Sequence, residues 1–211
     1  MRGKGKHTTM HTTTTTIDLL RHGEPVGGKR YRGQIDDPLS EKGWQQMWAS
    51  VGDHHPWDRI ITSPLARCRA FAEALGERHG IPVARDARLM EIGFGEWEGR
   101  TAEELLAEDP HRLQRFWSDP LNHTPPGAET LPDFAARVLA AWQEILQRHA
   151  GEHLLLVGHA GMMRMILRHV LDMPLDRMFR IQIANAAISR VQVDGEGEAA
   201  LPRLIFHDGR L

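Results

Sequence analysis

Three short apolar stretches of this sequence each end in residues that can hold or attack an anion. Arg21 and His22 close the stretch "IDLLRH", and Ser63 and Arg67 follow the stretch "WDRIIT". His159 follows the third stretch, "HLLLVG". Ligands of open α/β sheets bind outside the carboxyl ends of the strands. If the three stretches are neighbouring strands, these arginine and histidine side chains meet at one edge of a sheet.

Two arginines and two histidines at one edge would suit phosphoryl transfer. Arginine presents a planar fork whose N–H groups bind phosphate oxygens in pairs. The helices expected to begin at residues 63 and 161 add backbone N–H groups and positive dipole ends. A neutral imidazole can attack phosphorus if its other N–H is held by a hydrogen bond, and a protonated imidazole can stabilise the transferring group. We therefore predict a dianion pocket in which a phosphohistidine forms and water resolves it.

The leaving alcohol needs a proton, and the glycine-rich stretch "LMEIGFGEWEGR" (89–100) offers three carboxyl groups. A carboxyl group held near a phosphate dianion has its pKa raised by like charge, so it can act as a general acid. Glu91, Glu96 and Glu98 all lie in this stretch, and their spacing alone does not choose between them.

Strands and helices alternate along the chain, which indicates an α/β fold. We expect a three-layer α/β/α sandwich whose sheet is mostly parallel with an antiparallel edge from the C-terminal strands. The expected strands are 15–21, 57–62, 81–86, 153–158, 179–184, 187–194 and 202–207.

Capping residues predict where three of the helices begin. Ser40 precedes a helix with an apolar face, and Thr130 with Asp133 matches a capping box before another. Ser63 is expected to be the N-cap of the helix that runs to residue 79, with Pro64 at its first position.

We predict a single domain over residues 15–211 that carries a lid-like helical insertion at 92–130. Residues 1–14 are low in complexity, rich in threonine and without the apolar core of a secretory signal, so a disordered tail is expected. Met10 offers an alternative start of translation to Met1.

Composition narrows the classes of function. The formal charge of −2 over 211 residues argues against a nucleic acid partner and leaves room for a local basic pocket. The single cysteine, Cys68, forbids an internal disulfide and suits a cytoplasmic protein, and no apolar run reaches the length of a membrane span. The expected partner is a small-molecule phosphate ester, and the apolar C-terminal strands could form the edge of a homodimer.

Five ordered blocks carry a resemblance to a known family. They are "RHGE", "SPLARCRAFAE", "LMEIGFGEWEGR", "PPGAET" and "VGHAGMMRMIL", and they extend from about residue 17 to about residue 170. In this order they resemble the histidine phosphatase (phosphoglycerate mutase-like) superfamily. The resemblance implies that His22 is the phosphorylated nucleophile, that Arg21, Arg67 and His159 complete the phosphate pocket, and that Glu91 is the proton donor. It implies neither a metal nor an organic cofactor.

Further stretches, among them "GGKRYRGQIDDPLSEKGWQQM", resemble bacterial α-ribazole 5′-phosphate phosphatases, which act in cobalamin assembly. Pro25 and Gly28 stand where many relatives have a threonine and a phosphate-binding asparagine. Arg32 or Gln34 could replace that contact. The remaining residues predicted to contact substrate are Gly23, Ser63 and Ala160.

Other functions stay open at this point. A broad-specificity phosphatase would share the same blocks, and a phosphoglycerate mutase would need to keep its phosphohistidine from water. A non-catalytic phosphoester-binding module could use the same fold. A metallohydrolase is disfavoured because the histidines and carboxylates lack metal-ligand spacing.

Overall fold

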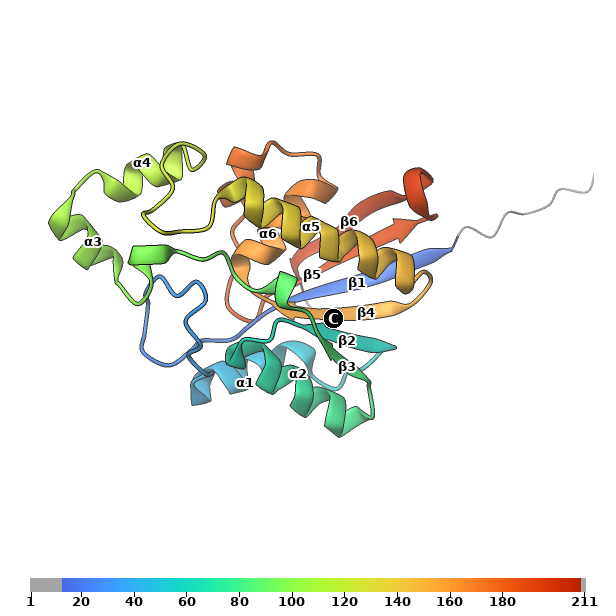
Figure 1. The fold of residues 1–211 in the computed structure, drawn as a ribbon. Coiled ribbons are helices and arrows are strands. Elements are labelled where there is room, and N and C mark those ends of the chain that lie inside the picture. Colours follow the sequence, from blue (N-terminus) through green and yellow to red (C-terminus); the bar gives the residue numbers. More distant parts are fainter. Residues whose placement is uncertain (1–12, 210–211) are drawn as a thin grey trace, which may run out of the picture.

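One mixed sheet of six strands organises the part of the chain that the computed structural model describes, residues 13–209 (Figure 1). The strand order across it is β3-β2-β4-β1-β5-β6. Neighbours from β3 to β1 pair in parallel, whereas β5 is antiparallel to both β1 and β6. The mostly parallel sheet with an antiparallel edge is thus confirmed. The strands are β1 (Thr14–Arg21), β2 (Arg59–Thr62), β3 (Val83–Arg85), β4 (His153–Gly158), β5 (Ile188–Asp194) and β6 (Leu201–Gly209).

The strands bury both faces because their side chains alternate with a period of two. Ile17 and Leu19 of β1 pack into the apolar cluster under α5 and α6, whereas Leu20 packs into the cluster under α1 and α2. Figure 1 shows these two pairs of helices on opposite faces, which confirms the α/β/α sandwich. The helices are α1 (Glu41–Val51), α2 (Ala66–His79), α5 (Leu131–Arg148) and α6 (Ala160–Val170).

Two of the three predicted helix caps are confirmed. The Ser40 hydroxyl accepts from the backbone N–H of Gly43, and the Thr130 hydroxyl accepts from that of Asp133. The third was wrong, because α2 begins at Ala66 rather than after Ser63. Residues 63–65 are an irregular connection between β2 and α2. At the start of α2, the Asp36 carboxylate accepts a hydrogen bond from the Ala66 N–H at 2.5 Å.

The C-terminal half differs from the prediction in one segment. Residues 179–184 are not a strand: the short 3-10 helix η3 (Leu175–Arg180) is followed by irregular chain. Ile183 is buried in the core, and Phe179 and Ile181 pack against it partly buried, so the alternation of apolar residues reflects the packing of an irregular segment. The carbonyl groups of Ile181 and Ile183 accept hydrogen bonds from arginine side chains instead of from a neighbouring strand.

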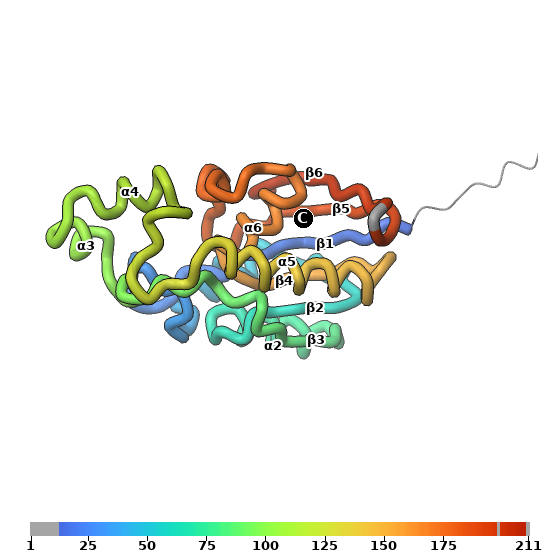
Figure 2. Tube along the Cα trace, turned by 45° about the horizontal axis from the view of Figure 1, so that its top comes forward, coloured from blue at the N-terminus to red at the C-terminus, as the bar shows by residue number. Residues whose placement is uncertain are grey.

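The segment 92–130 leaves the sheet and extends beyond the carboxyl ends of the parallel strands (Figures 1 and 2). Trp97, Leu105, Leu113 and Phe116 form a small core of their own within it. Its role as a lid remains a prediction. Its elements are η2 (Gly95–Trp97), α3 (Ala102–Glu108) and α4 (Arg112–Ser118), and the other 3-10 turns of the chain are η1 (Ala87–Leu89) and η4 (Gly197–Ala199).

The predicted N-terminal tail lies almost wholly in residues 1–12, outside the described residues, and β1 begins at Thr14, one residue before the predicted domain boundary. Over residues 13–209, no helix combines the length and the apolar character needed to cross a bilayer.

A buried carboxylate ties the middle of β1 to its neighbours. Asp18 is fully buried and accepts hydrogen bonds from Trp57 Nε1 at 2.8 Å, His153 Nε2 at 2.9 Å and Arg190 Nε at 2.8 Å. Burial alone would raise the pKa of Asp18, but the hydrogen bonds from these three partners outweigh it and lower the pKa. The charged form of Asp18 therefore stabilises the fold.

We expect Asp18→Asn to lower the free energy of unfolding by about 3 kcal/mol, the lower end for a buried pair, because Arg190 and His153 still reach solvent. The pKa of Asp18 in the folded protein lies below its ordinary value of 3.8. The stability that the charged carboxylate contributes is therefore present in full above about pH 3.8 and is lost as the pH falls through the pKa of the folded protein. Urea unfolding between pH 7 and pH 3 measures it. Asp194→Asn, at an exposed ion pair, is the control, and an equal loss in both variants would contradict the assignment.

Candidate active site

The imidazole of His22 is held in one tautomer directly after β1. Its Nδ1 lies 2.7 Å from the carbonyl oxygen of Gly23, and a carbonyl can only accept, so the proton sits on Nδ1. Nε2 then carries the free lone pair. The backbone N–H of His22 donates to Gly158 O at 2.9 Å, which joins the ends of β1 and β4. This is the orientation that a nucleophilic histidine requires.

His159 meets His22 from the neighbouring strand end. It is the N-cap residue of α6, it is fully buried, and its ring centroid lies 5.3 Å from that of His22. Its Nε2 lies 2.8 Å from Ser63 Oγ. Ser63 therefore braces His159, and it is not among the residues that line the cavity.

Both histidines are kept neutral by their surroundings. Burial and then the charges of Arg21 and Arg67 lower the pKa of His22 well below its ordinary value. Burial and then the charge of Arg67 do the same to the pKa of His159. The sequence predicted a protonated second histidine, whereas the protein alone favours the neutral form. A bound phosphate dianion would oppose the arginine charges and shift His159 towards protonation.

The buried Arg67 and the partly buried Arg21 complete this corner. Arg21 donates from Nη1 to Ile183 O at 2.6 Å, and Arg67 donates to Ile35 O at 2.6 Å and to Gly33 O at 2.7 Å. The Nε of each is buried without a hydrogen-bond partner in the described part of the chain. Guanidinium groups anchored only by neutral carbonyls retain their charge and spare donors for an anion.

The structure distinguishes the three candidate carboxyl groups. Glu91 lines the same cavity as His22, and its carboxylate accepts from the backbone N–H groups of Ile92 and Gly161, both at 3.0 Å. The Glu98 carboxylate already accepts hydrogen bonds from the backbone N–H groups of Gln34 and Phe94. Glu96 lines a separate hollow. Glu91 is therefore the candidate proton donor.

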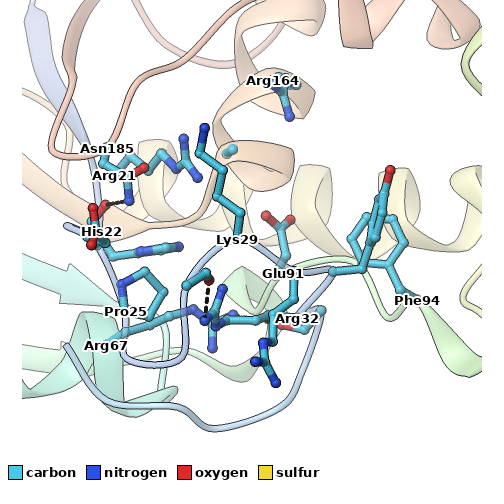
Figure 3. A pocket seen from close by; sticks show the side chains of 16 residues that line it. Arg21, His22, Pro25, Lys29, Arg32, Arg67, Glu91, Phe94, Arg164 and Asn185 are labelled. Atoms are coloured by element: carbon cyan, nitrogen blue, oxygen red, sulfur yellow. Dashed lines mark hydrogen bonds between the residues drawn. The ribbon is translucent and has the colours of Figure 1, made fainter. Parts of the chain in front are cut away.

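These side chains open into one cavity of about 430 Å³ at the carboxyl ends of the strands (Figure 3). No group of three or more histidine, cysteine or acidic residues suited to a metal ion occurs within residues 13–209. The lining residues are Arg21, His22, Glu24, Pro25, Gly28, Lys29, Arg30, Tyr31, Arg32, Gly33, Arg67, Glu91, Phe94, Ala160, Arg164 and Asn185.

The other predicted substrate contacts divide into two groups. Ala160, at the start of α6, and Arg32 line the cavity. Arg32 is nevertheless occupied by Asp37 at 2.9 Å and by the carbonyl groups of Val26 and Gly28, so it braces the loop around Pro25.

Gly23 and Gln34 do not line the cavity. A Cβ on Gly23 would lie 2.2 Å from Gly43 O, so this glycine lets the loop pack against α1 rather than against a ligand. Gln34 is exposed and donates to Glu91 O at 3.3 Å.

Sequence reasoning missed several lining residues, notably Lys29, Tyr31, Phe94, Arg164 and Asn185. Arg164 could have been found, because it lies one helical turn after Ala160 and so shares its face. Asn185 follows the segment wrongly predicted as a strand, and its placement depends on how that loop folds.

The family model "Histidine phosphatase superfamily (branch 1)" matches residues 17–203. The chain therefore belongs to the histidine phosphatase superfamily, as its motifs indicated.

Relatives within this superfamily have different names. A protein of Mycobacterium tuberculosis named as bifunctional is 32% identical over 204 residues, which cover 94% of this chain and 56% of that protein. The chain thus spans about half the length of this relative. A probable phosphoglycerate mutase of Klebsiella pneumoniae is 35% identical over 181 residues, 83% of each chain. Phosphoserine phosphatase 1 of Hydrogenobacter thermophilus is 30% identical over 182 residues, 83% of this chain and 85% of that protein.

Solved structures share the fold closely. A mycobacterial glucosyl-3-phosphoglycerate phosphatase superposes with a TM-score of 0.83 at 27% identity, covering 93% of this chain and 99% of that chain. A putative α-ribazole-5′-P phosphatase from Escherichia coli gives a TM-score of 0.75 at 23% identity, covering 90% and 95%. At that identity the second likeness speaks for the fold alone.

We expect the NMR signals of His22 and His159 to show no protonation step near pH 6.5 in the folded protein, because burial and the arginine charges oppose it. The unfolded chain takes up protons at both positions below its ordinary value of 6.5. The free energy of unfolding should therefore fall as the pH decreases through about 6.5. Resonances that titrate with the ordinary pKa would contradict this picture.

Proposed function

We propose that this chain is a phosphomonoesterase that hydrolyses a small phosphate ester through a phosphohistidine on His22. The observation that carries the proposal is the hydrogen bond from His22 Nδ1 to Gly23 O, at 2.7 Å. It leaves Nε2 as a lone-pair donor beside two cationic arginines. A binding module would have no need of an imidazole oriented in this way.

In the proposed first step, Arg21 and Arg67 hold the phosphoryl oxygens while His22 Nε2 attacks phosphorus. The N–P bond forms as the P–O bond to the alcohol breaks, and Glu91 gives its proton to the leaving oxygen. In the second step, water attacks phosphorus and gives a proton to the Glu91 carboxylate. The N–P bond breaks, inorganic phosphate is released, and free His22 is restored.

Hydrolysis and isomerisation differ only in what resolves the phosphohistidine. The loop that carries Glu91 is followed by the short helices α3 and α4 rather than by a long covering segment. Solvent-exposed residues, among them Lys29 and Arg30, line the cavity. We therefore favour water as the acceptor, with phosphoglycerate mutase activity as the second candidate because a relative bears that name.

The substrate proposed from the sequence is α-ribazole 5′-phosphate. Relatives named for phosphoserine and for glucosyl-3-phosphoglycerate make these esters the alternatives. A panel of the three, with inorganic phosphate release as the readout, would rank them.

Rapid mixing with p-nitrophenyl phosphate should give a burst of nitrophenolate equal to the enzyme concentration and a phosphoryl group on His22. Denaturation in alkali, where phosphohistidine survives, followed by peptide mass spectrometry locates the group. His22→Asn should abolish the label and lower kcat by about 10³-fold or more.

His169→Asn, at an exposed histidine of α6, is the matched control and should retain both. Label on another residue, or an active His22→Asn variant, would refute the mechanism. Formation of 2-phosphoglycerate from 3-phosphoglycerate without phosphate release would instead assign the mutase reaction.

A further inference from the structure

Two cations in the cavity are not assigned to the proposed phosphate site, paired with a carboxylate of the described residues or held by carbonyl groups at two nitrogens. Six basic side chains line the cavity, against the carboxylates of Glu24 and Glu91. Arg21 and Arg67 are assigned to phosphate, Arg32 is paired with Asp37, and Arg30 is held at both Nε and Nη1 by the carbonyl groups of Gly27 and Gly99. Arg164 and the exposed Lys29 remain, and neither forms an ion pair with a described residue.

Arg164 is oriented towards the cavity before any ligand arrives. Its Nε donates to Ile181 O at 2.8 Å, and its guanidinium carbon lies 5.9 Å from the Phe179 ring centroid. That is the only hydrogen bond of its guanidinium to the described residues, so the terminal N–H groups are free to face a ligand. An arginine fork held at Nε presents its two terminal nitrogens in the geometry that suits a planar carboxylate.

The position of Arg164 sets the spacing from the phosphate end. It follows Ala160 by four residues of α6, about 6 Å along the axis, and His159 caps the same helix. In Figure 3, Arg164 and Lys29 lie on one side of the Glu91 carboxylate, and Arg32 and Arg67 lie on the other. A ligand with its phosphate beside His22 would therefore place a second anionic group, a few bonds away, against Arg164.

We propose that Arg164, with Lys29 at the entrance, binds a carboxylate of the substrate, so that the enzyme prefers phosphate esters of hydroxy acids to those of neutral alcohols. This proposal rests on the proposed phosphomonoesterase function. It disfavours α-ribazole 5′-phosphate, which carries no carboxylate.

Two substrate pairs test this subsite, because the members of each differ at the carboxylate. They are O-phosphoserine against O-phosphoethanolamine, and 3-phosphoglycerate against glycerol 3-phosphate. Wild type should favour the carboxylated member of each pair in kcat/KM, mainly through KM. Arg164→Met should reduce that ratio by about 10- to 100-fold, the loss of a charge-assisted hydrogen-bonded pair, and Arg164→Lys should retain part of it.

Arg148→Met, which removes an exposed arginine of α5, should leave the ratio and the basal activity unchanged. The ratio of the two dissociation constants within each pair, measured by calorimetry on the His22→Asn variant, does not depend on turnover. Absence of phosphate release by wild type would refute the proposed function, whereas equal binding of both members of each pair would refute the carboxylate subsite. Preference for 1,3-propanediol bisphosphate over the carboxylated esters would assign Arg164 to a second phosphate and overturn the proposal.

A separate arrangement of hydrogen bonds surrounds the loop that carries Glu91. Arg137 of α5 donates from Nη1 to Arg88 O at 2.7 Å and to Met90 O at 2.8 Å, and from Nη2 to Glu91 O at 2.9 Å. Nε and Nη2 also bind the Glu129 carboxylate at 2.6 and 2.8 Å. Glu129 in turn accepts from the Gly93 N–H at 3.2 Å.

The Arg137–Glu129 pair thus forms hydrogen bonds with the backbone before, at and after Glu91. All five N–H donors of the guanidinium are used, as its planar geometry permits. We infer that Arg137 is a positioning residue that holds the Glu91 carboxyl at the leaving oxygen. This inference also rests on the proposed function, in which Glu91 is the proton donor.

Dependence on the leaving group separates positioning from a general structural role. Alkyl phosphates need protonation of the leaving oxygen, whereas nitrophenolate leaves with little help. Arg137→Met and Glu129→Gln should lower kcat/KM, which reports the steps up to departure of the leaving group, for glycerol 3-phosphate by about 10- to 100-fold more than for p-nitrophenyl phosphate, as Glu91→Gln should. In the Glu91→Gln background, Arg137→Met should add little to this selective loss.

Arg148→Met again serves as the control on the same helix and should show no selectivity. An equal loss for both leaving groups, in both the Arg137 and the Glu129 variants, would refute the positioning role. A phosphohistidine burst retained in Glu91→Gln would show that the proposed nucleophilic step stands independently of this inference.

Discussion

The candidate site depends on arginine side chains that are anchored by backbone carbonyl groups rather than by carboxylates. Arg21, Arg67 and Arg164 each donate to carbonyl oxygens of irregular segments, at 2.6 to 2.8 Å. A neutral acceptor orients a guanidinium without cancelling its charge. The corner of the sheet therefore keeps a positive potential, and burial together with this potential lowers the pKa of both neighbouring histidines and keeps them neutral.

In the middle of the sheet, by contrast, an arginine is paired with a carboxylate. Asp18 pairs with Arg190 and His153, so the charges there are cancelled and serve the fold alone. Both arrangements start from β1, whose residues alternate between the two layers and whose carboxyl end carries His22. The strand β1 thus carries Asp18, whose charge is paired within the sheet, and leads three and four residues later to Arg21 and His22 at the proposed phosphate site.

Local sequence was sufficient for features that depend on neighbours in the chain. The strand–helix alternation, the caps at Ser40 and Thr130 and the arginine and histidine at strand ends were all predicted, because periodicity and capping act over a few residues. Residues 179–184 were predicted wrongly because a buried irregular segment and a strand share the same apolar alternation. The Ser63 cap was wrong because α2 begins at Ala66, and local sequence gave no sign of the contact between the Ser63 hydroxyl and His159, 96 residues away.

By itself the sequence determined the superfamily, the layered fold and the set of side chains that reach the carboxyl edge of the sheet, since these follow from residue order and strand direction. The resemblance pointed to Glu91 among the three glutamates, but only the tertiary structure placed it in the same cavity as His22 and decided which nitrogen of that imidazole is free. The tertiary structure alone also brought Arg164 and Lys29 into the cavity and placed Arg137 around the Glu91 loop. Each of these depends on contacts between segments far apart in the chain, and no local pattern encodes such contacts.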